Sequence, residues 1–179
     1  MTEELIQKTL GIGGHHRPYR GSTDEWLTPP ELLGRLGEFD LDPCAAVKQP
    51  WPTAKKHLTV IENGLSMPWA GRVWCNPPYG PATGTWLSRL ASHTNGIALI
   101  FARTETEMFH REVWERADAC LFLEGRLYFY RLDGTRAKAN AGGPSVLIAY
   151  GAENVQALAE SGIKGALVRL DQIREGRKH

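Results

Sequence analysis

The chain has 179 residues, of which 42% are hydrophobic, and 21 Lys and Arg balance 20 Asp and Glu to a formal net charge of +1. This length suits one domain, and the composition is typical of globular proteins rather than of disordered or fibrous chains. No apolar run approaches the roughly 18 residues of a membrane span. The acidic residues 1–4 also lack the features of a secretory signal.

Three cysteines, Cys44, Cys75 and Cys120, are far apart in the sequence, and each lies in an apolar run. This pattern favours reduced thiols over a disulfide set or a zinc site. We expect a cytoplasmic protein without a metal centre. If a phage encodes it, the compartment is the host cytoplasm.

The expected elements alternate between strands and helices. Residues 1–23 show no sustained periodicity and are interpreted as an N-terminal arm, and residues 171–179 as a basic tail. A helix is expected from Pro29 to Gly37, with Thr28 as its N-cap. The other expected helices cover residues 86–93 and 105–116, and the expected strands 39–43, 57–61, 72–75, 96–102, 119–123, 127–131 and 145–150. This order predicts one three-layer α/β domain over residues 24–170, with a mostly parallel sheet.

The most informative motif is Asn76-Pro77-Pro78-Tyr79, which directly follows the expected strand 72–75. In an open parallel sheet, ligands bind beyond the carboxyl ends of the strands. An amine conjugated to a purine ring is a poor nucleophile. Two acceptors on its N–H bonds would favour a more nucleophilic geometry and stabilise the positive charge that develops as a methyl group is transferred.

The four residues of this motif supply what that reaction needs. The amide oxygen of Asn76 and the backbone carbonyl oxygen of Pro77 are the two acceptors, and Pro77 and Pro78 restrict the loop. Tyr79 offers an aromatic face for an extruded base. We therefore interpret all four residues as catalytic. The alternative is a rigid surface turn, because Asn and Pro also favour turns.

Further motifs accompany this loop in a fixed order. Trp26-Leu27-Thr28-Pro29-Pro30 and Leu41-Asp42-Pro43-Cys44-Ala45 precede it, as does Glu62-Asn63-Gly64-Leu65, and Gly125-Arg126-Leu127-Tyr128-Phe129 follows. With these motifs, the chain resembles the phage-type DNA N6-adenine methyltransferases, often called Dam-like, over residues 24–150. The resemblance implies a Rossmann-like methyltransferase fold, S-adenosylmethionine as methyl donor, and N6 of adenine in double-stranded DNA as acceptor.

The resemblance also implies which residues contact the donor. Thr28 and Pro29 look like the segment at the donor's methionine end, with Trp26 close by. Asp42-Pro43-Cys44-Ala45 looks like the donor loop after the first strand, in which Asp42 accepts a hydrogen bond from the donor's ammonium group. Glu62 and Asn63 correspond to the positions near the donor's adenine. The alternatives are an Asx turn for Asp42, a core position for Trp26 and a solvent-facing turn for Glu62.

The donor loop departs from the pattern of larger methyltransferases. Residues 42–46 contain no glycine, whereas larger relatives use a Gly-rich turn to let the backbone approach the donor. About twenty residues separate this loop from Glu62, which leaves little room for a crossover helix and a further strand. The donor-binding half is therefore expected to be abbreviated.

Several basic residues are candidates for DNA contact. Residues 131–143 combine Arg131, Arg136 and Lys138 with Gly and Asn, which is typical of a loop that orders against phosphates. Arg17 and Arg20 in the arm and Arg103 after the buried strand 96–102 are further candidates. The alternative for residues 131–143 is an ordinary solvated hairpin loop. A homodimer is an open alternative, since dimerisation would widen the DNA footprint of a small enzyme.

Two other functions remain open. The Asn-Pro-Pro-Tyr loop also suits methylation of adenine in RNA or of a glutamine amide in a protein, because each presents a planar conjugated nitrogen. The absence of a Gly-rich turn raises a second alternative, a non-catalytic DNA-binding or donor-sensing member of the fold.

Overall fold

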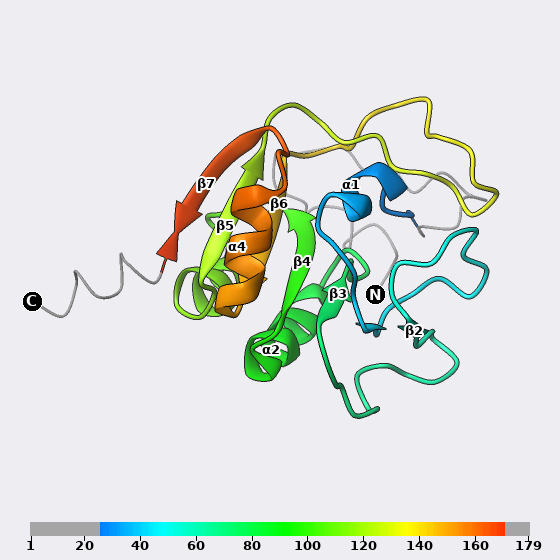
Figure 1. Ribbon diagram of the computed structural model, residues 1–179, viewed down its shortest axis with the longest axis horizontal. Helices are drawn as coiled ribbons and strands as arrows, with labels where there is room; N and C mark the ends of the chain where they lie inside the picture. The colour runs from blue at the N-terminus through cyan, green and yellow to red at the C-terminus, as the bar shows by residue number, and fades with distance from the viewer. Residues whose placement is uncertain (1–25, 171–179) are drawn as a thin grey trace, which may run out of the picture.

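The computed structural model describes residues 26–170, which form a seven-stranded sheet with helices on both of its faces (Figure 1). The strand order is β2-β1-β3-β4-β6-β5-β7. The strands are β1 (Leu41–Asp42), β2 (Lys56–His57), β3 (Val73–Cys75), β4 (Gly96–Phe101), β5 (Ala119–Leu123), β6 (Ser145–Tyr150) and β7 (Gly165–Arg169). The helices are α1 (Pro30–Gly34), α2 (Thr83–His93), α3 (Glu107–Phe109), the π-helical turn η3 (His110–Trp114) and α4 (Ala152–Glu160).

The directions of the strands correct the expectation of a mostly parallel sheet. β2, β1, β3 and β4 run parallel, but the pairs β4–β6, β6–β5 and β5–β7 are antiparallel, and these antiparallel ladders are the longer ones. β1 and β2 have only two residues each. Between β5 and β6 the chain has no helix, and parallel neighbours are usually joined through a crossover helix. The second half of the sheet therefore pairs antiparallel.

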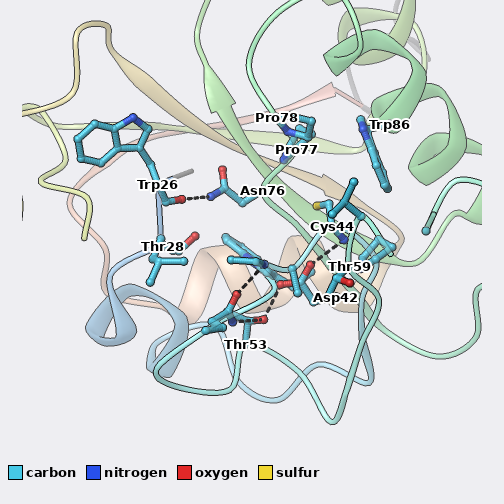
Figure 2. A pocket seen from close by; sticks show the side chains of 18 of the residues that line it. Trp26, Thr28, Asp42, Cys44, Thr53, Thr59, Asn76, Pro77, Pro78 and Trp86 are labelled. Carbon is cyan, nitrogen blue, oxygen red and sulfur yellow. Dashed lines mark hydrogen bonds between the residues drawn. The ribbon is translucent and has the colours of Figure 1, made fainter. Parts of the chain in front are cut away.

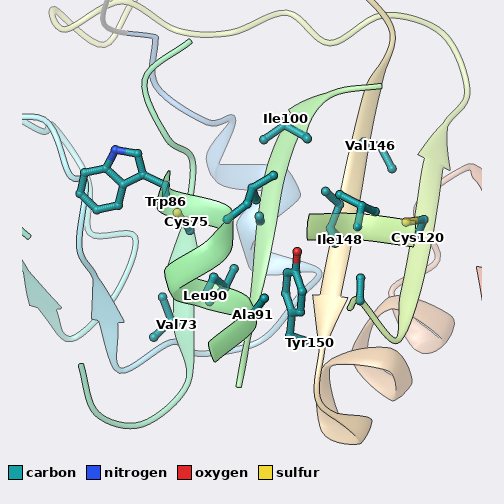
Figure 3. Close-up of a cluster of buried hydrophobic side chains, with 14 of the residues drawn as sticks. Val73, Cys75, Trp86, Leu90, Ala91, Ile100, Cys120, Val146, Ile148 and Tyr150 are labelled. Atoms are coloured by element: carbon teal, nitrogen blue, oxygen red, sulfur yellow. The ribbon is translucent and has the colours of Figure 1, made fainter. Parts of the chain in front are cut away.

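The core lies on both faces of the sheet because the central strands are apolar on both. Trp74, Leu99 and Ala149 belong to the cluster beneath α1 and α4. Their neighbours in sequence point the other way: Cys75 and Ile148 belong to the cluster covered by α2, α3 and η3 (Figure 3). Strands buried on both faces read as continuous apolar runs, as the sequence of β4 does. Helices on both sides make the predicted three layers.

The start of α1 differs from the prediction. The helix begins at Pro30, and Pro29 is the N-cap residue, without a side-chain cap. Thr28 is not the N-cap, because Leu27, the residue before it, is paired with Tyr130 through two backbone hydrogen bonds. The N–H of Leu27 donates to the carbonyl of Tyr130 at 2.9 Å, and the N–H of Tyr130 donates back at 3.0 Å. This bridge holds the chain extended up to the helix.

Four other elements depart from the expectation. Residues 127–131 form no strand, because Tyr130 makes isolated bridges to two different partners, Leu27 and Arg136. The expected helix 105–116 is shorter and changes from α3 to the π-helical turn η3. The sequence did not predict α4 and β7, although β7 completes the sheet at its edge.

Candidate active site

Two loops with predicted functional residues meet at one edge of the sheet. β1 and β3 are parallel neighbours, so the segments after Asp42 and Cys75 leave the sheet side by side. The chain goes from β1 to β2 on one side of β1 and then returns to β3 on the other. Such a switch point opens a crevice at the carboxyl ends of the strands, where ligands bind in open α/β sheets.

A cavity of about 540 Å³ lies at this switch point (Figure 2). This volume is within the range of small-molecule sites. Most of the predicted donor and catalytic residues line it. The lining residues are Trp26, Leu27, Thr28, Asp42, Pro43, Cys44, Ala45, Ala46, Gln49, Thr53, Thr59, Val60, Asn63, Gly64, Trp74, Asn76, Pro77, Pro78, Tyr79 and Trp86.

The amide of Asn76 is fixed at one end and unpaired at the other. Its Nδ2 donates to the backbone carbonyl of Trp26 at 3.1 Å. Because only the nitrogen can donate to a carbonyl, this bond sets which way the amide points. Its Oδ1 is buried and has no hydrogen-bond partner in the described part of the chain. Burying an acceptor without a partner costs free energy, so the arrangement suggests an external donor.

The rest of the Asn-Pro-Pro-Tyr loop is held by its neighbours. Pro77 is buried, and within residues 26–170 no hydrogen bond occupies its carbonyl oxygen. The carbonyl of Pro78 accepts from the hydroxyl of Thr83 at 2.8 Å, which ties the loop to the start of α2. The ring of Tyr79 stacks on Phe101, with centroids 4.4 Å apart and planes at 12°, and still has 38% of its surface exposed.

Asp42 ends β1 with a buried carboxylate that is only 3% exposed. Its Oδ1 accepts from the N–H of Cys44 at 3.0 Å, and its Oδ2 accepts from the hydroxyl of Thr53 at 2.5 Å. The first bond is the Asx turn that the sequence allowed as an alternative, yet the same residue lines the cavity. Burial raises the pKa of Asp42, and the bonds from Thr53 and Cys44 oppose that shift.

Gly64 allows the turn after β2 to approach the backbone of the donor loop closely. A Cβ atom at Gly64 would lie 1.8 Å from the carbonyl oxygen of Pro43. Two backbone bonds hold the same loops together, because Leu58 donates to the carbonyl of Asp42 at 2.8 Å and accepts from Ala45 at 3.0 Å. The glycine that permits close packing is therefore on the opposite loop.

Glu62 does not line the cavity. Its carboxylate accepts from the backbone N–H and the hydroxyl of Thr59, both at 2.7 Å, and these bonds lower its pKa. Glu62 thus closes its own exposed turn, as the solvent-facing alternative proposed. Asn63 does line the cavity, with a positive φ of 54° and its Nδ2 donating to Ser66.

Of the other residues predicted to contact the donor, most line the cavity, but Pro29 does not. Thr28 is buried and lines the cavity, whereas Pro29 does not line it and serves as the N-cap of α1. Trp26 lines the mouth with 36% of its surface exposed, so it is not a core residue. Cys44 also lines the cavity, and its sulfur lies 3.8 Å from that of Cys75. This contact and burial raise the pKa of the Cys44 thiol well above its usual range.

The basic segment after β5 lies next to the cavity mouth. The Leu27–Tyr130 bridge joins it to Leu27, the residue directly after Trp26, whose carbonyl accepts from Asn76. Arg131, Arg136 and Lys138 are exposed, and the guanidinium of Arg136 lies 4.3 Å from the centre of the Tyr128 ring. Arg103 is exposed just beyond β4. The candidates Arg17 and Arg20 lie outside the described residues.

Several residues that line the cavity belong to no sequence motif that would mark them as functional. Gln49 and Thr53 come from a proline-containing connection, and Thr59 from the turn after β2. Trp86, on α2, lies at the end of the cavity away from Trp26 (Figure 2). Its place in a helical apolar pattern indicates only core packing. Over residues 26–170 there is no group of three or more metal-binding side chains and no helix that could cross a membrane.

The comparison with family models decides the family. The model described as DNA N-6-adenine-methyltransferase (Dam) matches residues 18–175. The chain belongs to this family. The match confirms the Dam-like resemblance of the sequence, and it makes the chain a member of a family of enzymes that methylate DNA. Comparisons with curated proteins and with solved structures found no match.

Proposed function

We propose that this protein transfers a methyl group from S-adenosylmethionine to N6 of adenine in DNA. The observation that carries the proposal is the state of Asn76, whose Nδ2 is anchored to Trp26 while its buried Oδ1 lacks a partner among residues 26–170. An amide fixed in this way is an acceptor prepared for an N–H group from outside the chain. The family match supplies the acceptor class, adenine in DNA.

The carbonyl oxygen of Pro77, which accepts no hydrogen bond from the described residues, is the second acceptor. Together with Asn76 Oδ1, it would receive the two N–H bonds of the adenine amine. Preorganised acceptors lower the barrier because they are already oriented toward the charge that develops on the nitrogen. The bond from Thr83 to the carbonyl of Pro78 keeps this loop in place before substrate binds.

The cavity fits the proposed donor in its chemistry. When bound, S-adenosylmethionine supplies an electrophilic methyl group on a sulfonium. Asp42 is a buried carboxylate at the cavity, which suits the donor's ammonium group, and Thr28 lies beside the same space. The aromatic ring of Trp86 suits a flat apolar group at the far end. The four parallel strands β2, β1, β3 and β4 support a Rossmann-like methyltransferase fold around this cavity.

Adenine must leave the duplex to reach Asn76. Enzymes that modify bases extrude the target nucleotide and stack it against aromatic side chains. Tyr79 is exposed beside Asn76, and Phe101 supports its ring from behind, so the ring is a stable stacking surface. The exposed cations Arg131, Arg136 and Lys138 would bind phosphates around that opening.

The deciding experiment measures transfer of a radiolabelled methyl group from S-adenosylmethionine to unmethylated duplex DNA. We expect N6-methyladenine with the wild-type chain and a loss of turnover of about 100-fold or more with Asn76→Ala, the effect of removing one preorganised hydrogen-bond group. DNA affinity should change little. Parallel reactions with RNA and with glutamine-containing peptides test the other acceptors.

The outcomes separate the candidate functions. Transfer to RNA or peptide but not to DNA would replace the proposed acceptor. DNA binding without transfer to any substrate would favour a non-catalytic role. If Asn76→Ala retained wild-type turnover on DNA, the proposed role of the amide would be wrong.

A further inference from the structure

A chain of hydrogen bonds from Gln49 through Thr53 to Asp42, called here the polar relay, holds the Asp42 carboxylate in place beneath the cavity. Thr53 is buried, with 8% of its surface exposed, and its hydroxyl donates to Asp42 Oδ2 at 2.5 Å. The N–H of Cys44 donates to Asp42 Oδ1 at 3.0 Å. Figure 2 shows Thr53 below Asp42 at the base of the site. A carboxylate has about four lone-pair positions, so two remain for another donor.

Gln49 determines which way the Thr53 hydroxyl points. Its Nε2 donates to Thr53 Oγ1 at 3.0 Å and to the carbonyl of Trp51, also at 3.0 Å. Its Oε1 accepts from the N–H of Ala46 at 3.3 Å, which fixes the amide orientation. Since Thr53 Oγ1 accepts from Gln49, its own proton is directed to Asp42.

The carboxylate held by this relay has no cationic partner from Lys or Arg among the described residues. The titratable groups that face it are the imidazole of His57 on β2 and the thiol of Cys44. His57 Nε2 accepts from the backbone N–H groups of Thr53 and Ala54, so it also supports the relay. A buried carboxylate without a paired cation at a cavity is suited to a cationic ligand.

We propose that Thr53, with its hydroxyl oriented by Gln49, is a positioning residue that fixes the geometry and the charge of Asp42 for the ammonium group of the methyl donor. This inference rests on the proposed function. It assigns to the 46–53 connection the task of holding Asp42, and with it the donor loop, in one conformation.

The relay also controls protonation. Burial raises the pKa of Asp42, and the hydrogen bond from Thr53 lowers it. The ionised carboxylate binds the ammonium group, so donor affinity is full above this pKa and falls as the pH falls through it. Removing the Thr53 hydroxyl raises the pKa of Asp42 further, so the loss of affinity must begin at a higher pH.

The test measures binding of S-adenosylhomocysteine, which carries the same ammonium group, by calorimetry from pH 4.5 to 8. Thr53→Val keeps the shape of the side chain and removes the hydroxyl, whereas Thr53→Ser keeps the hydroxyl. At pH 7 we expect affinity about tenfold weaker for Thr53→Val, as for loss of a hydrogen bond to a charged group, and within about twofold of wild type for Thr53→Ser. The midpoint of the acid limb should move up by about one pH unit in Thr53→Val only.

Thermal unfolding of each variant establishes that the fold is retained. Wild-type affinity and an unshifted acid limb in a folded Thr53→Val protein would overturn the inference, and equal weakening by Val and Ser would show that Thr53 acts through packing alone. Both results leave the proposed methyl transfer intact. Failure of the wild-type chain to bind S-adenosylhomocysteine at any pH would instead remove the proposed donor, and the inference with it.

Discussion

Replacing Gly64 with alanine should damage the donor site more than any other small change in the cavity wall. The new Cβ atom would lie 1.8 Å from the carbonyl oxygen of Pro43 and 2.8 Å from its carbonyl carbon, whereas ordinary contact begins at 3.4 Å. The two loops must therefore separate by about 1.6 Å, because the clash is with backbone and no side chain can rotate away. Overpacking of this kind costs about 1–3 kcal/mol.

The separation should lower donor affinity because Pro43 directly follows Asp42. We expect S-adenosylhomocysteine to bind Gly64→Ala at least about tenfold more weakly, as a shift of about 1.4 kcal/mol implies, while DNA affinity stays near wild type. The matched control is Gly34→Ala, since a Cβ atom at Gly34 meets nothing within 4 Å. Calorimetry measures the donor and fluorescence anisotropy the DNA. Wild-type donor affinity and melting temperature in Gly64→Ala would refute this account of the loop contact.

Three further variants test other parts of the structure. Tyr79→Leu should lower turnover about tenfold in a methyl-transfer assay, since base stacking on an aromatic ring contributes about 1–3 kcal/mol, while Tyr79→Phe should stay near wild type. Arg136→Ala should weaken DNA binding and reduce its salt slope by about one, as measured by anisotropy titrations at several salt concentrations. Tyr150→Phe should lower stability to denaturant by about 1 kcal/mol without changing turnover, because the buried hydroxyl donates to the carbonyl of Glu112 at 2.7 Å.

Each of these variants has a result that would count against its argument. Equal turnover for Tyr79→Leu and wild type would remove the stacking role. An unchanged salt slope for Arg136→Ala would mean that its guanidinium stays on the Tyr128 ring when DNA binds. A loss of turnover in Tyr150→Phe at unchanged stability would place this distant hydroxyl in the catalytic path, contrary to its position in the core.

The sequence predicted the buried strands well and the exposed ones poorly. β4 and β6 are continuous apolar runs, and such runs carry their own signal because both faces are buried. Most of β7 is exposed, so it has no burial pattern, and its place depends on pairing with β5. Residues 127–131 showed the opposite error. Their apolar and aromatic residues suggested a strand, but their backbone pairs singly with Leu27 and Arg136.

In the candidate site, the motif residues could be predicted from the sequence, but the groups that hold them in place could not. Asn76 and Asp42 were predicted from motifs, and both line the cavity. The partners that hold them were not predicted, because Trp26 contributes a backbone carbonyl and Thr53 a hydroxyl from an irregular connection. A backbone acceptor has no residue-type signal, and only the tertiary fold determines which carbonyl it is.

The antiparallel half of the sheet, which the sequence did not predict, explains how so short a chain brings basic residues to the active site. β6 pairs antiparallel with both β4 and β5, so β5 runs in the same direction as β4 and ends at the edge where Asn76 follows β3. The connection from β5 to β6 must therefore begin and end at that edge. It crosses beside the cavity, where Tyr130 pairs with Leu27 and Arg136 is exposed. A parallel β5–β6 pair would have needed a crossover to the opposite edge of the sheet, and that crossover would have used these residues to cover the sheet.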